Sequence, residues 1–348
     1  MQSIKSSALE PTRPELAGLS RWQAVGRILP VYGLPLLTVL LIIFFSILLP
    51  DTFPTALNAR SILSDKAIIA MLSLAATLPM MAGRIDLTVG FGIVMWHILA
   101  ISLQVKYGVP WPVATLIVVA CAASVGLLNG VLVEIAQVDA FIATLGTGTI
   151  LYAFALWHTE GRQIMGMLAP GFIALNTTSV AGIPIPALYV LGLAVVLWLV
   201  SERLPIGRYI YAIGANEKAA ALNGIPVRTY VIGVFVASGV VAGLAGCVLA
   251  AKLRIGQANV GLDYLLPALV GAFLGSTTIK PGRVNIWGTM FGVLILAVGI
   301  SGIQQLGGAF FVEPLFNGTT LVVSIALAAF AQRRRTVVRP ARIVKDPG

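Results

Sequence analysis

Residues that could carry out chemistry are few in this chain and far apart. His97, Cys121 and Cys247 lie in apolar runs, and His158 is remote from all three, so no spacing matches a metal site, a disulfide framework or a catalytic triad. No lysine follows a glycine, so the phosphate-binding pattern GxxxxGK[ST] is absent. We therefore expect a protein that is not an enzyme and that holds no metal and no cofactor.

The composition indicates an integral membrane protein. Hydrophobic residues make up 58% of the 348 residues, charged residues only 10%, and the mean hydropathy is +0.96. The net charge of +10 comes from short segments between and beyond the apolar runs. Positive residues on the cytoplasmic side of a membrane explain this pattern better than a nucleic-acid partner, which we exclude.

Ten apolar runs approach the roughly 20 residues that a transmembrane helix requires. The predicted spans are 31–49, 63–82, 86–105, 112–133, 139–157, 184–200, 230–251, 263–279, 284–306 and 313–331. The predicted fold class is therefore an all-α polytopic membrane protein of about ten transmembrane helices.

Lysine and arginine set the predicted orientation. With the N-terminus in the cytoplasm, most of the 23 Lys and Arg residues fall on the cytoplasmic side, and ten spans return the C-terminus to the same side. We expect a cytoplasmic tail over 1–29, a transmembrane domain over 30–332 with a cytoplasmic loop at 201–229, and a basic cytoplasmic tail over 333–348. We expect lipid around the transmembrane domain.

The stretch MAGRIDLTVG, residues 81–90, places two charges between apolar runs. Arg84 falls at a predicted cytoplasmic turn, where positive charge is favoured. Asp86 begins the next span, where its carboxylate can accept hydrogen bonds from unpaired backbone N–H groups and meet the positive end of the helix dipole. We expect Asp86 to cap this helix, and the alternative is that it lines a path next to a broken helix.

The largest predicted cytoplasmic loop contains a short helix with clear ends. Pro205 and Gly207 break the preceding helix, and Gly214 and Asn216 offer a turn and a cap before the sequence EKAAAL, residues 217–222. Asn223, Gly224 and Pro226 then end the helix. The segment is either a protruding element that a partner recognises or an ordinary amphipathic connector.

The sequence of this loop, GRYIYAIGANEKAAALNGIPV (207–227), closely resembles the coupling segment of permease subunits of ribose-type ABC importers, which take up carbohydrates in bacteria. GRIDLTVG (83–90) is similar to the family pattern GGIDLSVG. Further resemblances are NGVLVEIAQVDAFIATLGT (129–147), TEGRQI (159–164) and the region 261–296, and together they cover most of residues 60–331 in the family's order. The chain departs from the family at Arg84, where glycine is common, and at Pro281.

The resemblance implies a location in the bacterial inner membrane, and it implies partners that spacing alone does not reveal. Two permease subunits, either two copies or this chain with a sister permease, would form the path. Two cytosolic ABC ATPase subunits would drive it, and a periplasmic or extracytoplasmic sugar-binding protein would deliver the substrate. The residues implied in coupling to the ATPase are Gly214, Asn216, Glu217, Ala220, Ala221, Leu222 and Gly224. Arg162 and Gln163, in the largest predicted outside loop, are our candidates for docking the binding protein.

GRIDL (83–87) and GRVNI (282–286) match in kind at every position, which is a weak indication of duplicated halves. If the duplication is real, the two motifs flank the path from two sides. The resulting path candidates are Gly83, Asp86, Gly90, Gly282 and Asn285.

The predicted function is the permease subunit of an ATP-driven ABC importer of a monosaccharide or a related polyol. The alternative is an ion-coupled secondary transporter of a small polar solute, which needs acidic residues in mid-membrane. Asp86, Glu134 and Asp139 all fall at predicted span ends, within reach of water, so a proton relay is not indicated.

Overall fold

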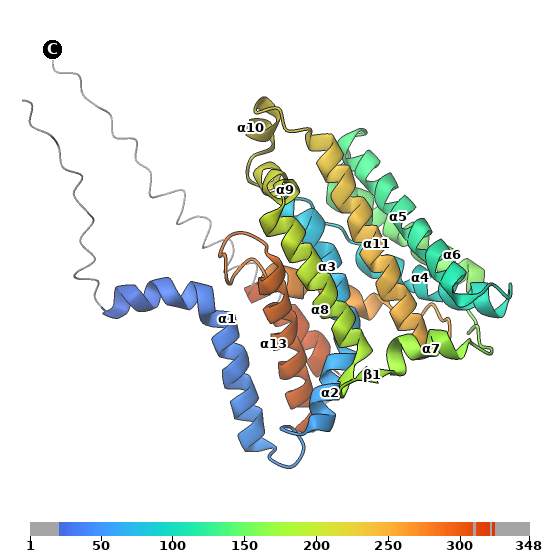
Figure 1. Cartoon of the computed structure of the whole chain (residues 1–348), viewed down its shortest axis with the longest axis horizontal. Helices are drawn as coiled ribbons and strands as arrows, with labels where there is room; N and C mark the ends of the chain where they lie inside the picture. Colours follow the sequence, from blue (N-terminus) through green and yellow to red (C-terminus); the bar gives the residue numbers. More distant parts are fainter. Residues whose placement is uncertain (1–20, 309–310, 321, 324–348) are drawn as a thin grey trace, which may run out of the picture.

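The computed structural model describes residues 21–308, 311–320 and 322–323. The chain forms a helical bundle with a small antiparallel pair of strands, β1 (Ser179–Val180) and β2 (Ile183–Pro184) (Figure 1). The helices are α1 (Arg21–Leu48), α2 (Ala56–Asp65), α3 (Ala67–Met81), α4 (Thr88–Val105), α5 (Trp111–Glu134), α6 (Ala140–Thr159), α7 (Pro170–Thr177), α8 (Ile185–Trp198), α9 (Pro205–Ala215), α10 (Glu217–Leu222), α11 (Val227–Leu253), α12 (Leu265–Leu274) and α13 (Ile286–Gln305).

Six helical segments in the described ranges are long and apolar enough to cross a bilayer. They are α4, α5, α6, α8 with its π-helical continuation to Arg203, α11 and α13. A bent pair, α2 and α3, meets the same criterion if it is one span, and the apolar parts of α1 and α12 are shorter. The prediction of a helical membrane protein is confirmed. Residues 313–320 and 322–323 of the predicted span 313–331 are helical, and the rest of it lies outside the described residues, as do residues 1–20 and the tail 333–348.

Two helices near the N-terminus extend beyond the predicted spans. Helix α1 begins at Arg21, ahead of the predicted span 31–49, and α2 begins at Ala56, ahead of the predicted span 63–82. Both extensions contain polar residues, so a search for apolar runs does not detect them. Thr55 caps α2 by accepting a hydrogen bond from the N–H of Asn58. Helices α2 and α3 meet at Lys66 with a bend of 41°. The predicted span 63–82 therefore consists of two helical segments with different axes.

The predicted span 263–279 is also wrong in its second half. Helix α12 ends at Leu274, and ten residues of α-helix reach only about 15 Å of the roughly 30 Å hydrocarbon core. Residues 275–285 then run without regular helix to the start of α13. Gly275, Pro281 and Gly282 in this stretch explain the break, because glycine and proline weaken helices.

Helix α3 forms the centre of the bundle and is buried along nearly its whole length. It lies against α11, α12, α13 and α8. Helix α11 also packs closely on α5, and this contact depends on small residues. A Cβ on Gly126 would lie 2.3 Å from the backbone oxygen of Phe235, and one on Gly239 would lie 2.3 Å from that of Ala122. Helices in lipid gain stability from such close backbone approach, because burial away from water supplies little driving force there.

Candidate functional site

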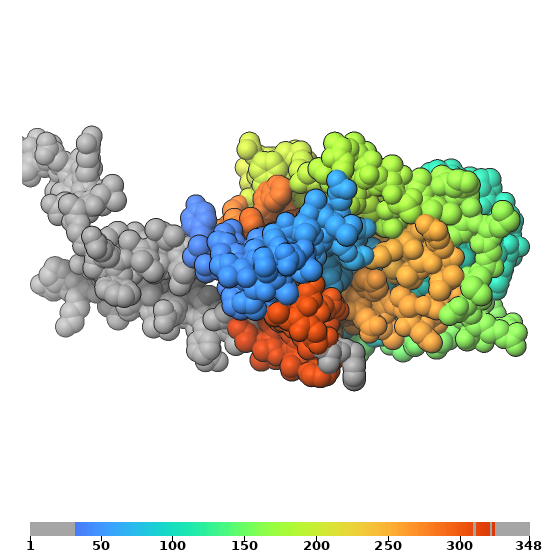
Figure 2. All heavy atoms as spheres, turned by 90° about the horizontal axis from the view of Figure 1, so that it is seen from below, coloured from blue at the N-terminus to red at the C-terminus, as the bar shows by residue number. Residues whose placement is uncertain are grey.

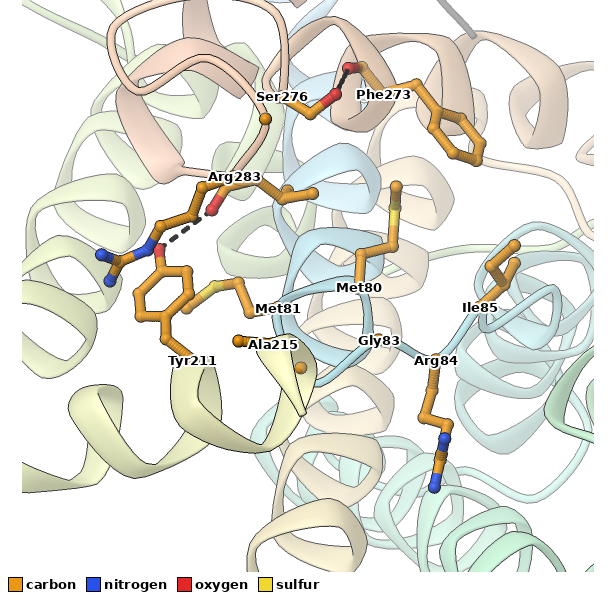
Figure 3. Close-up of a pocket in the computed structure, with 13 residues that line it drawn as sticks. Met80, Met81, Gly83, Arg84, Ile85, Tyr211, Ala215, Phe273, Ser276 and Arg283 are labelled. Atoms are coloured by element: carbon orange, nitrogen blue, oxygen red, sulfur yellow. Dashed lines mark hydrogen bonds between the residues drawn. The ribbon is translucent and has the colours of Figure 1, made fainter. Parts of the chain in front are cut away.

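The two sequence motifs that resemble each other line one cavity. It has a volume of about 470 Å³ and lies where α3 ends, where α13 begins, and beside α9 (Figure 3). We call it the α9 cavity. Its walls include Gly83, Arg84 and Ile85 from the first motif, and Gly282, Arg283 and Val284 from the second. Met80, Met81, Tyr211, Gly214, Ala215, Phe273 and Ser276 complete its lining. The tertiary structure thus brings together two segments that are about 200 residues apart in the chain.

Both motifs require glycine at their first position. Gly83 has φ of +76° and Gly282 has φ of +80°, a backbone conformation that costs side-chain-bearing residues free energy. Each glycine lies in a turn between helices, α3 and α4 for Gly83, α12 and α13 for Gly282. The correspondence therefore extends from sequence to backbone geometry.

Asp86 does accept the capping hydrogen bond that the sequence predicts. Its Oδ1 accepts from the backbone N–H of Thr88 at 2.9 Å and from the hydroxyl of Thr88, and its Oδ2 accepts from Oγ of Ser238 on α11 at 2.9 Å. The prediction that it lies within reach of water is wrong, because the side chain is 1% exposed. The contact with α11 that buries it was not predictable from the local pattern.

A buried polar network surrounds the start of α4. Thr144 Oγ1 on α6 accepts a hydrogen bond from the backbone N–H of Leu87 at 3.1 Å. Asn129 on α5 donates through Nδ2 to Thr88 Oγ1 at 3.2 Å and accepts at Oδ1 from Thr147 on α6 at 2.7 Å. Backbone groups without partners are costly in lipid, so these contacts from α5, α6 and α11 stabilise the break between α3 and α4. Of this set, sequence reasoning identified only Asp86.

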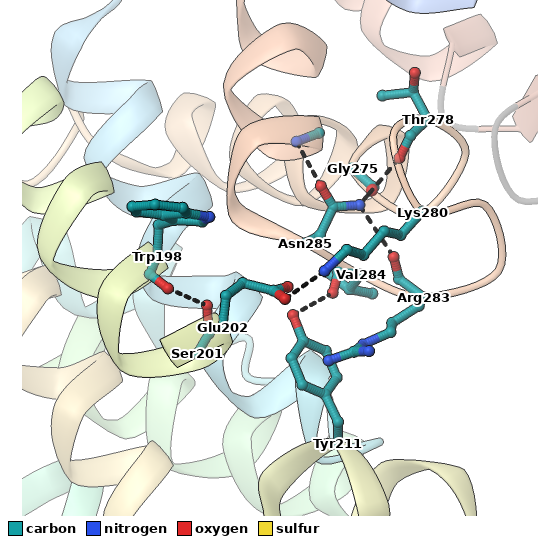
Figure 4. Close-up of polar contacts among 11 residues, drawn as sticks. Trp198, Ser201, Glu202, Tyr211, Gly275, Thr278, Lys280, Arg283, Val284 and Asn285 are labelled. Carbon is teal, nitrogen blue, oxygen red and sulfur yellow. Dashed lines mark hydrogen bonds and ion pairs between the residues drawn. The ribbon is translucent and has the colours of Figure 1, made fainter. Parts of the chain in front are cut away.

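Asn285 plays the corresponding part in the second motif (Figure 4). Its Oδ1 accepts from the N–H of Gly288 at 2.8 Å, which caps α13. Its Nδ2 donates to the backbone oxygens of Gly275 at 2.7 Å, Thr278 at 3.0 Å and Arg283 at 3.2 Å. One amide therefore closes the irregular segment that joins α12 to α13, with a side chain that is 3% exposed.

The second motif also contacts α9 directly. Tyr211 donates a hydrogen bond to the backbone oxygen of Val284 at 3.0 Å, and the Arg283 guanidinium lies 3.2 Å from the centre of the Tyr211 ring. Burial raises the pKa of Tyr211 to about 12, although the positive charge of Arg283 acts in the opposite direction. The phenol therefore remains protonated and able to donate at neutral pH. Lys280 forms an ion pair with Glu202 beside this contact.

Arg84 makes contacts that the sequence did not predict. Its Nη2 lies 3.0 Å from Oε1 of Glu134, the last residue of α5, and 2.8 Å from Oε2 of Glu217, the first residue of α10. Burial lowers the pKa of Arg84, but the two carboxylates outweigh that effect and the net shift is upward. Glu134 is buried, which contradicts the predicted access to water, whereas Asp139 is exposed and caps α6.

The predicted coupling helix has the predicted bounds. Helix α10 spans Glu217–Leu222, and Oδ1 of Asn216 caps it by accepting from the N–H of Ala219 at 3.0 Å. Gly224 follows with φ of +79°, Ala220 is buried, and the Leu222 side chain is 89% exposed. Helix α10 lies at one extremity of the bundle, opposite α2 and α7 (Figure 1).

The predicted break of the preceding helix at Pro205 is confirmed, because that helix ends at Arg203 and α9 begins at Pro205, in a first-turn position that proline tolerates. The predictions for two glycines are wrong, because Gly207, expected to break the preceding helix, and Gly214, expected to lie in a turn, are both inside α9. A Cβ on Gly214 would lie 2.2 Å from the backbone oxygen of Met81, so this glycine permits α9 to contact the end of α3.

The end of the bundle that contains α2 is the face seen in Figure 2. Arg162 is exposed, Gln163 donates to Oε1 of Gln257 at 2.7 Å, and Ile164 pairs with Gly256 through backbone hydrogen bonds. The segment around Arg162 thus lies beside the loop that follows α11.

A cavity of about 540 Å³ opens at this same end, and we call it the α2 cavity. Ion pairs of Lys252 with Asp65 at 2.8 Å and of Lys66 with Glu313 at 3.0 Å contribute four of its lining residues. Lys66 is the residue at which α2 bends into α3. Of these residues, the sequence singled out none, because the pairs join segments far apart in the chain.

Broken membrane helices that meet around cavities at the two ends of an apolar bundle are typical of polytopic membrane transport proteins. The sequence model of the family described as branched-chain amino acid transport system / permease component matches residues 58–331, and the chain belongs to this family. It is a multi-pass protein of the bacterial inner membrane, and the expected kinship with permease subunits of sugar ABC importers is confirmed.

Three relatives illustrate the similarity. The chain is 33% identical to the ribose import permease protein RbsC of Bacillus subtilis, over 83% of this chain and 89% of the relative. It is 30% identical to the ribose import permease protein RbsC of Haemophilus influenzae, over 82% and 89% of the two chains. It is 28% identical to the D-allose transport system permease protein AlsC of Escherichia coli, over 85% and 90%. No solved structure matches the chain.

Replacing Asp86 tests whether its role is structural. Asp86→Asn keeps an acceptor for the Thr88 N–H and gains a donor for Ser238 Oγ, so we expect a thermal unfolding temperature in detergent close to that of the unaltered protein. Asp86→Ala leaves both groups unpaired and should cost about 1–3 kcal/mol. Asp51→Asn, at an exposed position, is the control. If Asp86→Asn unfolds as readily as Asp86→Ala, the capping assignment fails; if it folds but does not transport, Asp86 lines the path.

Proposed function

We propose that this chain is the permease subunit of an ATP-driven importer that translocates a monosaccharide or a related polyol. The names of the relatives, ribose and D-allose permeases, support this substrate class. The observation that carries the proposal is the convergence of the two glycine-containing turns, at Gly83 and Gly282, on the α9 cavity. Broken helices at corresponding positions in two halves are the usual location of a transport path. Gly83 and Gly282 line this cavity and are then the path candidates at this end, whereas the buried Asp86 and Asn285 hold the two turns beside it.

Gly90 has a different place in this proposal. A Cβ on Gly90 would lie 2.4 Å from Cβ of Leu265, so this glycine permits close contact of α4 with the start of α12. It belongs to the packing behind the path rather than to the wall of the α9 cavity.

The proposed topology has ten spans and both termini in the cytoplasm. Ten segments supply these spans. They are α1, the bent pair of α2 and α3, α4, α5, α6, α8, α11, α12 together with the irregular segment that follows it, α13 and the predicted span 313–331. This orientation places α10 and the α9 cavity on the cytoplasmic side, where most Lys and Arg residues then lie. The α2 cavity, with its two ion pairs, faces the periplasm and is the proposed entrance.

The proposed partners follow from this orientation. Helix α10 docks into a groove of a cytosolic ABC ATPase subunit, which hydrolyses ATP, and the contact uses the partly exposed Glu217 and the exposed residues Asn216, Ala221, Leu222 and Gly224. The buried Ala220, together with Gly214, which contacts the end of α3, holds the segment against the bundle. A periplasmic sugar-binding protein docks on the opposite face near Arg162 and Gln163. A second permease, identical or a sister chain, completes the path.

One observation favours the alternative of an ion-coupled transporter, namely the burial of Asp86 and Glu134. Each carboxylate, however, has partners that hold it in place. Glu134 is paired with Arg84, and Asp86 accepts from Thr88 and Ser238. Neither faces the α9 cavity as a lining residue, which disfavours a proton relay through it.

The decisive experiment is uptake of labelled D-ribose, with D-allose as a second probe, into proteoliposomes that contain the permease, its ATPase subunits and its binding protein. We expect uptake that requires ATP and the binding protein and that survives a proton uncoupler. Uptake without ATP that collapses with the proton gradient would replace the proposal by the ion-coupled alternative.

A bulky substitution on α10 tests the docking role. We expect Ala221→Trp to leave membrane insertion intact and to lower transport per ATP hydrolysed by about tenfold, because Ala221 is exposed on α10 and a large side chain obstructs a helix-in-groove contact. The matched control is Ala153→Trp, at an exposed position of α6. Equal coupling in both variants would argue against docking through α10.

Charge reversal at Arg162 tests the periplasmic docking site. We expect Arg162→Glu to weaken binding of the sugar-binding protein by roughly tenfold, since a like charge at a complementary interface is repelled, whereas Arg162→Lys should retain most of the affinity. The measurement is the equilibrium affinity of the binding protein for the permease complex in nanodiscs. Unchanged affinity for both variants removes Arg162 from the interface.

A further inference from the structure

Three charged side chains from three separate segments meet at the α10 end of the bundle. Arg84 comes from the turn between α3 and α4, Glu134 from the end of α5, and Glu217 from the start of α10. Arg84 donates through Nε and Nη2 to Oε1 of Glu134, at 3.3 and 3.0 Å, and through Nη2 to Oε2 of Glu217 at 2.8 Å. One guanidinium therefore joins α10 to the bundle.

The two ion pairs differ in their exposure. The side chain of Glu134 is 2% exposed, that of Arg84 is 25% exposed and that of Glu217 is 44% exposed. Separating a buried ion pair leaves an uncompensated charge, which is strongly unfavourable, whereas an exposed pair exchanges with water at small cost. The contact with Glu134 is thus the fixed one, and the contact with Glu217 is the one that can open.

The same arginine adjoins the α9 cavity. Gly83, Arg84 and Ile85 line the cavity through their turn, while the Arg84 side chain is directed away from Tyr211 and Met80 (Figure 3). It points instead toward a second hollow of about 460 Å³, whose lining includes Asp139 and Glu217. A displacement of Glu217 therefore acts directly on the turn that forms one wall of the α9 cavity.

The turn of residues 82–87 is held by hydrogen bonds at one end and contains a glycine with a left-handed backbone conformation at the other. Asp86 ties its far end to α4 and α11 through Thr88 and Ser238, and Gly83 occupies the left-handed backbone region. When Arg84 is displaced, the hydrogen bonds of Asp86 hold one end of the turn in place. The backbone rotates at Gly83, where glycine tolerates a wide range of dihedral angles. Hinges of this kind absorb backbone changes in switching proteins.

We propose that Arg84 is a positioning residue that transmits movement of α10 to the turn of residues 82–87 and so changes the width of the α9 cavity mouth. The proposal rests on the docking role proposed above for α10. Glu217 is the releasable contact and Glu134 the fixed one. If Arg84 served only to neutralise the buried Glu134, its pair with Glu217 would be dispensable.

Neutral variants separate these two roles. Glu134→Gln removes the buried charge but leaves the Arg84–Glu217 ion pair. Glu217→Gln removes the Arg84–Glu217 ion pair but leaves the buried Arg84–Glu134 pair. Arg84→Gln/Glu134→Gln removes the link without leaving a buried unpaired charge and without altering Glu217, so it is free of any direct effect on ATPase docking. Arg228→Gln, an exposed arginine at the start of α11, is the matched control.

The first measurement is transport of labelled D-ribose per ATP hydrolysed in proteoliposomes of the full complex. We expect Glu134→Gln and Arg228→Gln to retain the ratio of the unaltered protein. Glu217→Gln and Arg84→Gln/Glu134→Gln should each lower it by about tenfold while ATP hydrolysis continues. Normal ratios in both of the latter variants, or a loss in Glu134→Gln equal to that of the double variant, would overturn the proposal.

The second measurement needs no sugar and therefore stands apart from the proposed substrate. Ile85→Cys, in a background with Cys121→Ser and Cys247→Ala, is labelled by a water-soluble maleimide with and without vanadate trapping of the ATPase. We expect trapping to change the labelling rate at least threefold and Arg84→Gln/Glu134→Gln to abolish that change. A trapping effect that persists in the double variant refutes the link, even if the complex transports neither D-ribose nor D-allose.

Discussion

The hydrogen-bond requirement of buried backbone groups is the constraint on which this structure depends. Helices α3 and α12 both end before the next helix begins, and the backbone groups buried at each break need partners inside the protein, because water does not reach them. Asp86 and Thr144 supply them at the first break, and Asn285 at the second. The polar side chains in the bundle are therefore part of its architecture, and the two turns that they hold in place line the α9 cavity.

The two breaks are related but not identical. Each begins with a glycine in the left-handed region, continues with an arginine, and reaches a carboxylate or amide that accepts an N–H of the following helix. The arginines of the two motifs, however, contact different helices. Arg283 lies over the ring of Tyr211 on α9, whereas Arg84 pairs with Glu134 and Glu217. The second motif is thus fastened to α9 and the first to α5 and α10, so the two walls of the cavity are coupled to different parts of the segment that contains α9 and α10.

The helices around these two breaks pack closely against one another. The glycines and alanines on α5 and α11 bring two backbones into direct contact, and α11 provides Ser238 to Asp86 from that same position. Interiors packed in this way do not deform continuously, so small displacements at one site become shifts of whole segments. This explains how a helix of six residues could influence a cavity that it does not itself line.

The sequence by itself determined the membrane class, most of the apolar helices, the bounds of α10 and the capping function of Asp86. These features depend on local properties, namely apolar run length, breaker residues and side chains adjacent to helix starts, which are visible in a few consecutive residues. Only the tertiary structure decided that α12 stops after ten residues, that Asp86 and Glu134 are buried, that both glycine motifs share a cavity, and that Arg84 joins α5 to α10. Each of these depends on contacts between segments up to about 200 positions apart, and the free energy of such contacts follows from packing rather than from local sequence pattern.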